Sequence, residues 1–234
     1  MFVKAARAEA KPGGSLRIGL GHGATTDSLD PATYPDQMTG TFGWGSIGNS
    51  LTEVDVKGQI QPDLAESFES TDNATKWVFK LRKGLTFHNG KSVTAADVVA
   101  SFKHHMGKDS KSAAKSVLAA VADVKADGDN VVFTLSGANG DFSYLTSDYH
   151  IPICPANADG TMDWQSGVRT GPYIMDKWEP GVRATAKKNP NYHRTTFFDD
   201  MTMTVIADVA ARTNALTSGE VDFIDRCDLK TVDL

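Results

Sequence analysis

The sequence has little cysteine and lacks a long apolar run. Its 234 residues include two cysteines, Cys154 and Cys227, which have neither metal-binding nor redox spacing. Two free, buried thiols are one interpretation of this pair, and a single disulfide is the other. Because no run of about 18 apolar residues occurs, the sequence predicts no membrane-spanning helix.

The sequence also lacks a basic excess and the short motifs of common enzymes. Lysine and arginine number 24 against 29 aspartates and glutamates, for a net charge of −5, which predicts no nucleic-acid partner. There is no G-x-S-x-G, H-E-x-x-H or paired C-x-x-C motif. We therefore expect no catalytic residues, no metal ligands and no cofactor. A hidden hydrolase triad is the least favoured alternative, since a triad is defined by geometry rather than by sequence position.

What is present is ordinary globular composition, with 40% hydrophobic and 23% charged residues. Residues 1–14 are small and weakly basic, and contain alanine-x-alanine triplets typical of a signal-peptidase site. We expect a disordered N-terminus left after a signal peptide was removed from an exported protein. A merely frayed terminus is the alternative.

Periodicity and turn residues predict a mixed α and β chain. Thr94 with Asp97 forms a capping box for a helix, and an Ala- and Ser-rich stretch predicts a second helix over 111–122. The end of the chain predicts a βαβ unit, with strands at 201–206 and 221–224 around a helix at 209–217. The other predicted strands are 15–20, 51–56, 67–70 with 77–81, 121–126 with 131–135, and a hairpin within 171–187.

Residues 21–38 differ from the rest because they contain Asp30-Pro31 and Tyr34-Pro35. Prolines at these places predict an irregular loop rather than a helix. A loop of this length is uncommon in a compact domain unless it has a function, such as lining a site.

The most specific pattern lies between Leu64 and Phe102. Its segments are Leu64-Ala65-Glu66-Ser67-Phe68, Leu81-Arg82-Lys83-Gly84, Phe87-His88-Asn89-Gly90 and Thr94-Ala95-Ala96-Asp97-Val98. This pattern resembles the signature region of the bacterial extracellular solute-binding proteins of family 5, which serve peptide, nickel and opine ABC importers. Further segments similar to the family are Ser28-Leu29-Asp30-Pro31, Thr170-Gly171-Pro172-Tyr173, Asn189-Pro190-Asn191-Tyr192 and the stretch 215–222.

Two positions depart from the family pattern. Arg169 stands where the family favours glycine, and His193 stands where it favours tryptophan. We expect neither departure to matter much. The signature residues Arg82, His88 and Thr94 are expected to build turns and caps rather than to contact a ligand.

The resemblance implies an α/β (mixed α+β) fold, a type II periplasmic-binding-protein-like lobe. Members of the family are considerably longer, so we expect an incomplete first lobe whose second lobe is absent. Residues 15–40 and 155–234 would form the core domain of this lobe, without its C-terminal return. Residues 41–154 would form a smaller inserted α+β domain that carries the signature.

The function that the resemblance implies is solute capture, not catalysis. Such a protein binds a small solute in the periplasm, a peptide in the first place, and presents it to the permease subunits of an ABC importer. A nickel chelate, an opine or another small solute is the alternative ligand. A chemosensory partner built on the same fold is a further alternative.

The resemblance also indicates where the ligand binds, because the loop after the first strand lines the family's cleft. We expect five ligand-binding residues there, with an ordinary surface loop as the alternative: Thr33, Tyr34, Asp36, Gln37 and Met38. Tyr149 and His150, in the segment 148–150, are a second candidate group. Trp44 and Trp164 are candidate ligand surfaces, although core packing is the favoured interpretation of both.

Overall fold

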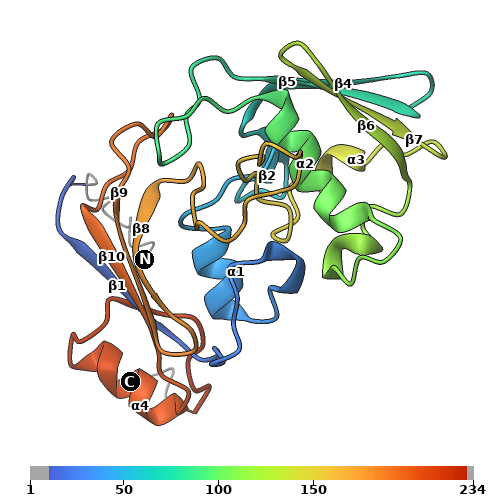
Figure 1. Cartoon of the computed structure of the whole chain (residues 1–234). Coiled ribbons are helices and arrows are strands. Elements are labelled where there is room, and N and C mark those ends of the chain that lie inside the picture. The colour runs from blue at the N-terminus through green and yellow to red at the C-terminus, as the bar shows by residue number, and fades with distance from the viewer. Residues whose placement is uncertain (1–10, 231–234) are drawn as a thin grey trace, which may run out of the picture.

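The structure, a computed structural model, describes residues 11–230 (Figure 1). Most of the predicted N-terminal segment, residues 1–10, lies outside the described residues. Gly13 donates its N–H to the carbonyl of Phe197 at 2.7 Å, and Gly14 donates to the carboxylate of Asp199 at 3.1 Å. The chain is therefore hydrogen-bonded to the fold before the first strand begins.

The larger sheet has five strands in the order β11-β1-β10-β9-β8. Both β10 and β11 run parallel to β1, whereas β9 is antiparallel to β10 and to β8. Helix α4 (Val209–Thr217) connects β10 to β11, so the predicted βαβ unit is confirmed, with β1 between its two strands. The strands are β1 (Ser15–Leu20), β8 (Tyr173–Glu179), β9 (Arg183–Lys188), β10 (Asp200–Val205) and β11 (Phe223–Ile224).

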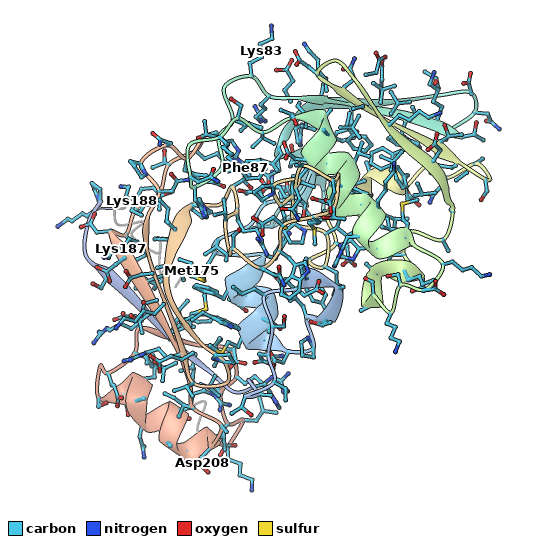
Figure 2. All side chains as sticks on the ribbon, viewed as in Figure 1. Lys83, Phe87, Met175, Lys187, Lys188 and Asp208 are labelled. Atoms are coloured by element: carbon cyan, nitrogen blue, oxygen red, sulfur yellow. The ribbon has the colours of Figure 1, made fainter. Side chains whose placement is uncertain are left out.

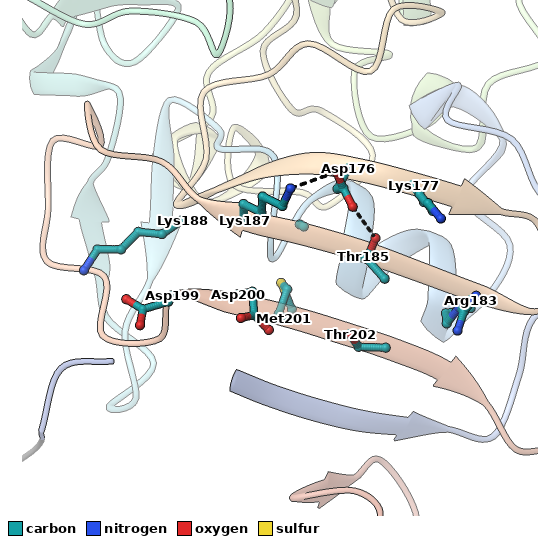
Figure 3. A pocket seen from close by; sticks show the side chains of 11 residues that line it. Asp176, Lys177, Arg183, Thr185, Lys187, Lys188, Asp199, Asp200, Met201 and Thr202 are labelled. Carbon is teal, nitrogen blue, oxygen red and sulfur yellow. Dashed lines mark hydrogen bonds and ion pairs between the residues drawn. The ribbon is translucent and has the colours of Figure 1, made fainter. Parts of the chain in front are cut away.

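The two faces of this sheet differ because successive side chains alternate between them. Ala184, Ala186 and Met203 are buried in a core shared with helix α1 (Gln37–Gly43). The opposite face is polar, and Figure 3 shows Asp176 within reach of Lys187 and Thr185 there. Figure 2 shows Met175 on the side of α1 and Lys187 projecting away from it.

A second, antiparallel sheet has the order β4-β5-β7-β6. Helix α2 (Ala95–Met106) packs on β6 and β7, and the short helix α3 (Phe142–Leu145) adds Phe142 to the same aromatic core. The ring centroids of Phe102 and Phe133 lie 4.7 Å apart. The hairpins predicted within 67–81 and 121–135 are confirmed in β4 (Ala65–Thr71), β5 (Lys76–Leu81), β6 (Val121–Asp127) and β7 (Asn130–Leu135).

A small two-stranded sheet, β2 (Thr52–Val54) with β3 (Ile60–Pro62), contains the strand predicted at 51–56. The hydrophobic residues form two buried clusters. One draws its buried members from residues 51–153, and the other from residues 18–47 and 173–203. The proposed division of the chain near residues 40 and 155 stays a prediction.

Two sequence-based expectations about helices are wrong. The stretch 111–122 contains only a 3-10 turn at Ala113–Lys115, because Val121 already pairs with Leu135 in the sheet. The loop predicted over 21–38 ends early, because α1 begins at Gln37. The carboxylate of Asp36, the residue after Pro35, caps this helix by accepting the N–H of Thr39 at 3.1 Å.

The two cysteines are free in the structure. Cys154 is buried, as the free-thiol interpretation expects, whereas Cys227 is exposed.

Candidate functional site

The loop that precedes α1, residues 21–36 and here called the first loop, is fastened to α2. The carboxylate of Asp30 accepts the N–H of Ala32 at 3.0 Å and lies 2.8 Å from Nε2 of His104 on α2. Burial acts to raise the pKa of Asp30, but the hydrogen bonds from His104 and Ala32 outweigh it, and the pKa is lowered. The Asp30–His104 pair thus holds the first loop against α2, the helix that packs on the four-stranded sheet.

Three of the five candidate residues around the first loop do not line the hollow beside α1. Met38 is fully buried in the core, and Tyr34 is buried with its hydroxyl donating to the carbonyl of Leu29 at 3.3 Å. Burial raises the pKa of Tyr34 to about 12, so its hydroxyl keeps its proton. Thr33 is exposed, and its hydroxyl donates to the carbonyl of Asp30 at 2.9 Å. Asp36 and Gln37 are the two that line a hollow.

This hollow, the α1 groove, has a volume of about 470 Å³. Trp44, at the end of α1, is fixed because its indole N–H donates to the hydroxyl of Ser50 at 2.9 Å. Tyr149 packs over Gly40, since a β-carbon placed on Gly40 would lie 3.4 Å from the tyrosine ring. The groove thus combines two aromatic surfaces with a few polar groups, as sites for small molecules do. It is lined by Pro35, Asp36, Gln37, Gly40, Thr41, Trp44, Gly45 and Tyr149.

The two candidate groups from the sequence meet at this groove. Tyr149 is 42% exposed and forms one wall, whereas His150 is 8% exposed and lies behind it. The ring centroids of Tyr149 and His150 are 3.8 Å apart. Nε2 of His150 lies 3.3 Å from the carbonyl oxygen of Tyr34, so segments that are 116 residues apart in the chain are in contact.

A smaller hollow of about 130 Å³ adjoins the groove and shares Trp44 and Gly45 with it. Its floor contains the buried carboxylate of Asp63, which accepts from Nδ2 of Asn49 at 3.0 Å. Arg194 lies 3.1 Å and His193 3.3 Å from the other oxygen of this carboxylate. The ring of His193, which departs from the family pattern, therefore lies beside a buried carboxylate.

Arg169, the other residue that departs from the family pattern, also makes specific contacts within the fold. Its guanidinium is fully buried and donates to the carbonyls of Val168 (2.8 Å), Leu29 (3.0 Å) and Trp164 (3.2 Å). Burial and these bonds fix residues 164–169 against the first loop. The backbone carbonyl of Trp164 accepts this bond from Arg169. Trp164 does not line the α1 groove.

The signature residues have the structural roles that the sequence predicts. Nδ1 of His88 accepts the backbone N–H of Arg169 at 3.3 Å, so Nε2 carries the proton and donates to the carbonyl of Gly171 at 3.1 Å. Burial lowers the pKa of His88 to about 4, which keeps this ring neutral. Arg82 donates to the carbonyl of Asp63 at 2.6 Å, and Asp97 accepts the N–H of Thr94 at 2.8 Å.

Sequence reasoning missed Gly40, Thr41 and Gly45 in the groove. They lie on or just after α1, which the prolines at 31 and 35 concealed. The spacing of Asp36 and Thr39, a helix-capping pattern, was the available signal.

Within residues 11–230, no group of three or more His, Cys, Asp or Glu side chains is arranged to hold a metal ion. In the same part of the chain, no helix is both long and apolar enough to cross a membrane.

Together, the mixed five-stranded sheet, the smaller sheet with α2 and the groove beside α1 define a lobe of a periplasmic binding protein. Two solved structures share this arrangement. The protein AgaA from A. tumefaciens R10, in complex with agropinic acid, has a TM-score of 0.85 and 30% identity, covering 94% of this chain and 45% of AgaA. The oligopeptide-binding protein AppA from Bacillus subtilis, in complex with a nonapeptide, has a TM-score of 0.80 and 25% identity, covering 91% of this chain and 44% of AppA.

The chain belongs to the bacterial extracellular solute-binding proteins, family 5, because the model of that family's middle region matches residues 59–234. Protein XP55 from Streptomyces lividans is 31% identical over 236 residues, which cover 94% of this chain and 43% of XP55. The chain therefore spans less than half the length of these relatives. The predictions of the family and of an incomplete mixed α/β lobe are confirmed.

Proposed function

We propose that this chain is the first lobe of the substrate-binding component of an ABC importer. In the complete protein it captures a small solute, a peptide in the first place, in the periplasm. It presents that solute to the permease subunits without changing it chemically. The observation that carries this proposal is the α1 groove, in which Trp44 and Tyr149 face a common space beside Asp36 and Gln37.

A peptide fits the chemistry of this groove. The aromatic surfaces of Trp44 and Tyr149 suit apolar side chains, because such rings supply large contact areas with an apolar body. Gln37 and Asp36 offer a carboxamide and a carboxylate to backbone amides or to an ammonium group. The complex of AppA with a nonapeptide supports this ligand class by similarity.

An opine is the second candidate ligand, because AgaA, 30% identical to this chain, is solved with agropinic acid. A nickel chelate or another small solute would use the same aromatic walls. A chemosensory partner would also bind a solute here and then dock on a receptor rather than on a permease.

A thermal-shift screen of the full-length protein tests the proposal. The panel contains peptides, a nickel–histidine chelate, opines and oligosaccharides. We expect one class to raise the melting temperature, because a ligand at about 100 times its Kd stabilises the native state by about 2.7 kcal/mol. Mass spectrometry should recover that compound unchanged. No shift with any class, together with hydrolysis of one of them, would contradict the proposal.

A further inference from the structure

We propose that His150 is a positioning residue of the α1 groove, and that its doubly protonated ring fastens the wall residue Tyr149 to the first loop. The inference rests on the proposed function of the groove and adds a means of regulating it: solute capture weakens as His150 loses a proton.

The argument begins with what the two ring nitrogens face. Nδ1 lies 2.8 Å from Oδ1 of Asp148, and Nε2 lies 3.3 Å from the carbonyl oxygen of Tyr34. A carboxylate oxygen and a carbonyl oxygen both accept hydrogen bonds, and neither donates. A neutral imidazole carries one N–H and satisfies one of them, leaving a lone pair directed at the other. The imidazolium form satisfies both.

The same ring supports the groove wall. Tyr149 lies between the His150 ring, at a centroid distance of 3.8 Å, and Gly40 of α1. His150 itself is 8% exposed, so it meets Tyr149 from behind and leaves the groove to the tyrosine. When both ring nitrogens donate, Tyr149, Asp148 and the backbone of Tyr34 are held as one unit.

The titratable groups around the His150 ring come from its own loop, from α2 and from the first loop. Asp148, on the same loop, accepts from the backbone N–H and the ring of His150, and its pKa is lowered because these bonds outweigh its burial. His105, on α2, is the nearby base, and burial lowers its pKa to about 4, so it is neutral. Tyr34, on the first loop, is also neutral. The carboxylates of the first loop are Asp27, Asp30 and Asp36, and Asp30 is paired with His104 of α2.

Nuclear magnetic resonance of the chain tests the protonation state without any ligand. Long-range proton–nitrogen spectra are recorded between about pH 6 and pH 8.5, in the range where histidines titrate, with His150→Gln used to assign the ring. We expect both His150 nitrogens to be protonated at the acidic end, and the Tyr149 ring signals to shift with the same midpoint as the ring. Asp148→Asn should move that midpoint to lower pH. A neutral ring throughout, or Tyr149 signals that ignore the titration, would overturn the proposal.

Affinity measurements on the full-length protein test the consequence, with tri-alanine and agropinic acid as probes at about pH 6 and about pH 8. The probe that binds should bind about threefold to tenfold more weakly at the higher pH, the effect of losing one ordinary hydrogen bond. His150→Gln should remove this difference. An equal pH dependence in His150→Gln and wild type would overturn the positioning role. Failure of both probes at both pH values counts against the proposed ligand classes, and the spectra then decide the positioning role alone.

Discussion

The hydroxyl of Tyr34 occupies the space that a side chain on Gly43 would need. A β-carbon built on Gly43 would overlap the phenol oxygen and lie 2.9 Å from the ring carbon Cε2. Gly43 is the last residue of α1, and Tyr34 ends the turn that leads into it. Helix α1 therefore approaches the first loop this closely because residue 43 is glycine.

Replacing this glycine should loosen the fold beneath the groove. We expect Gly43→Ala to lower the free energy of unfolding by about 1–3 kcal/mol, since the buried Tyr34 must shift to admit the added methyl group. Urea denaturation followed by circular dichroism measures the change. Gly107→Ala is the matched control, because a β-carbon there meets nothing within 4 Å. Equal stability of the two variants would show that Tyr34 adjusts freely.

Replacing Arg169 with lysine should destabilise the protein. A lysine ammonium lacks the planar fork that donates to the carbonyls of Leu29, Val168 and Trp164, and it is more costly to bury. We expect Arg169→Lys to reduce the free energy of unfolding by about 2 kcal/mol or more. The exposed Arg183→Lys should change it by less than about 0.5 kcal/mol. A neutral Arg169→Lys variant would contradict the role assigned to this guanidinium.

Asp63 should be far more sensitive than an exposed carboxylate. Removing its charge leaves Arg194 and His193 without their common partner, and turns an amide group towards them. Arg194 is 34% exposed and keeps its hydrogen bond to Glu53, so we expect a cost of about 1–3 kcal/mol. Glu66→Gln breaks an exposed pair with Lys80 and should leave the melting temperature nearly unchanged, because exposed ion pairs contribute little to stability. Differential scanning calorimetry of Asp63→Asn and Glu66→Gln compares them, and similar melting temperatures would contradict the prediction.

Acid should destabilise the protein through His105. Burial lowers its pKa from 6.5 to about 4, so between these values the unfolded chain binds a proton that the folded chain does not. Stability is therefore present above about pH 6.5 and falls as the pH drops towards 4, by about 1.4 kcal/mol per pH unit within that window.

Denaturation curves at several pH values measure this slope. His105→Asn keeps a polar group near Ser112 but does not titrate there, so its slope should be smaller than that of the wild type. His22→Gln changes an exposed histidine and should leave the slope unchanged. An identical slope in wild type and His105→Asn would contradict the assignment.

The sequence predicted best where a local pattern determines the structure. The Asp127-to-Asn130 turn, the Thr94 capping box and the helix at 209–217 depend on neighbouring residues, and the structure contains all three. The stretch 111–122 was misread because its Ala and Ser content favours a helix, whereas pairing of Val121 with Leu135 is decided by a distant strand. Likewise, the contacts of Arg169 and His193 join segments far apart in the chain.

Only some of the residues that line the α1 groove could be predicted from the sequence. The first loop and the segment 148–150 were expected from the family resemblance, but nothing local brings Tyr149 over Gly40. Tyr34 and Met38 were proposed as ligand contacts because they lie in that loop. The capped helix at Gln37 instead turns both side chains into the core and leaves Asp36 and Gln37 at the surface.

The most direct test of the α1 groove as the solute site compares two tyrosines of similar exposure. Tyr149, 42% exposed, forms a wall of the groove, whereas Tyr144, 40% exposed, lies outside it. Isothermal titration of the full-length protein with the solute found in the thermal screen should show at least a roughly fivefold loss of affinity in Tyr149→Ala, as expected for removing an aromatic anchor. Tyr144→Ala should bind as the wild type does. Wild-type affinity in Tyr149→Ala would contradict the assignment of the groove.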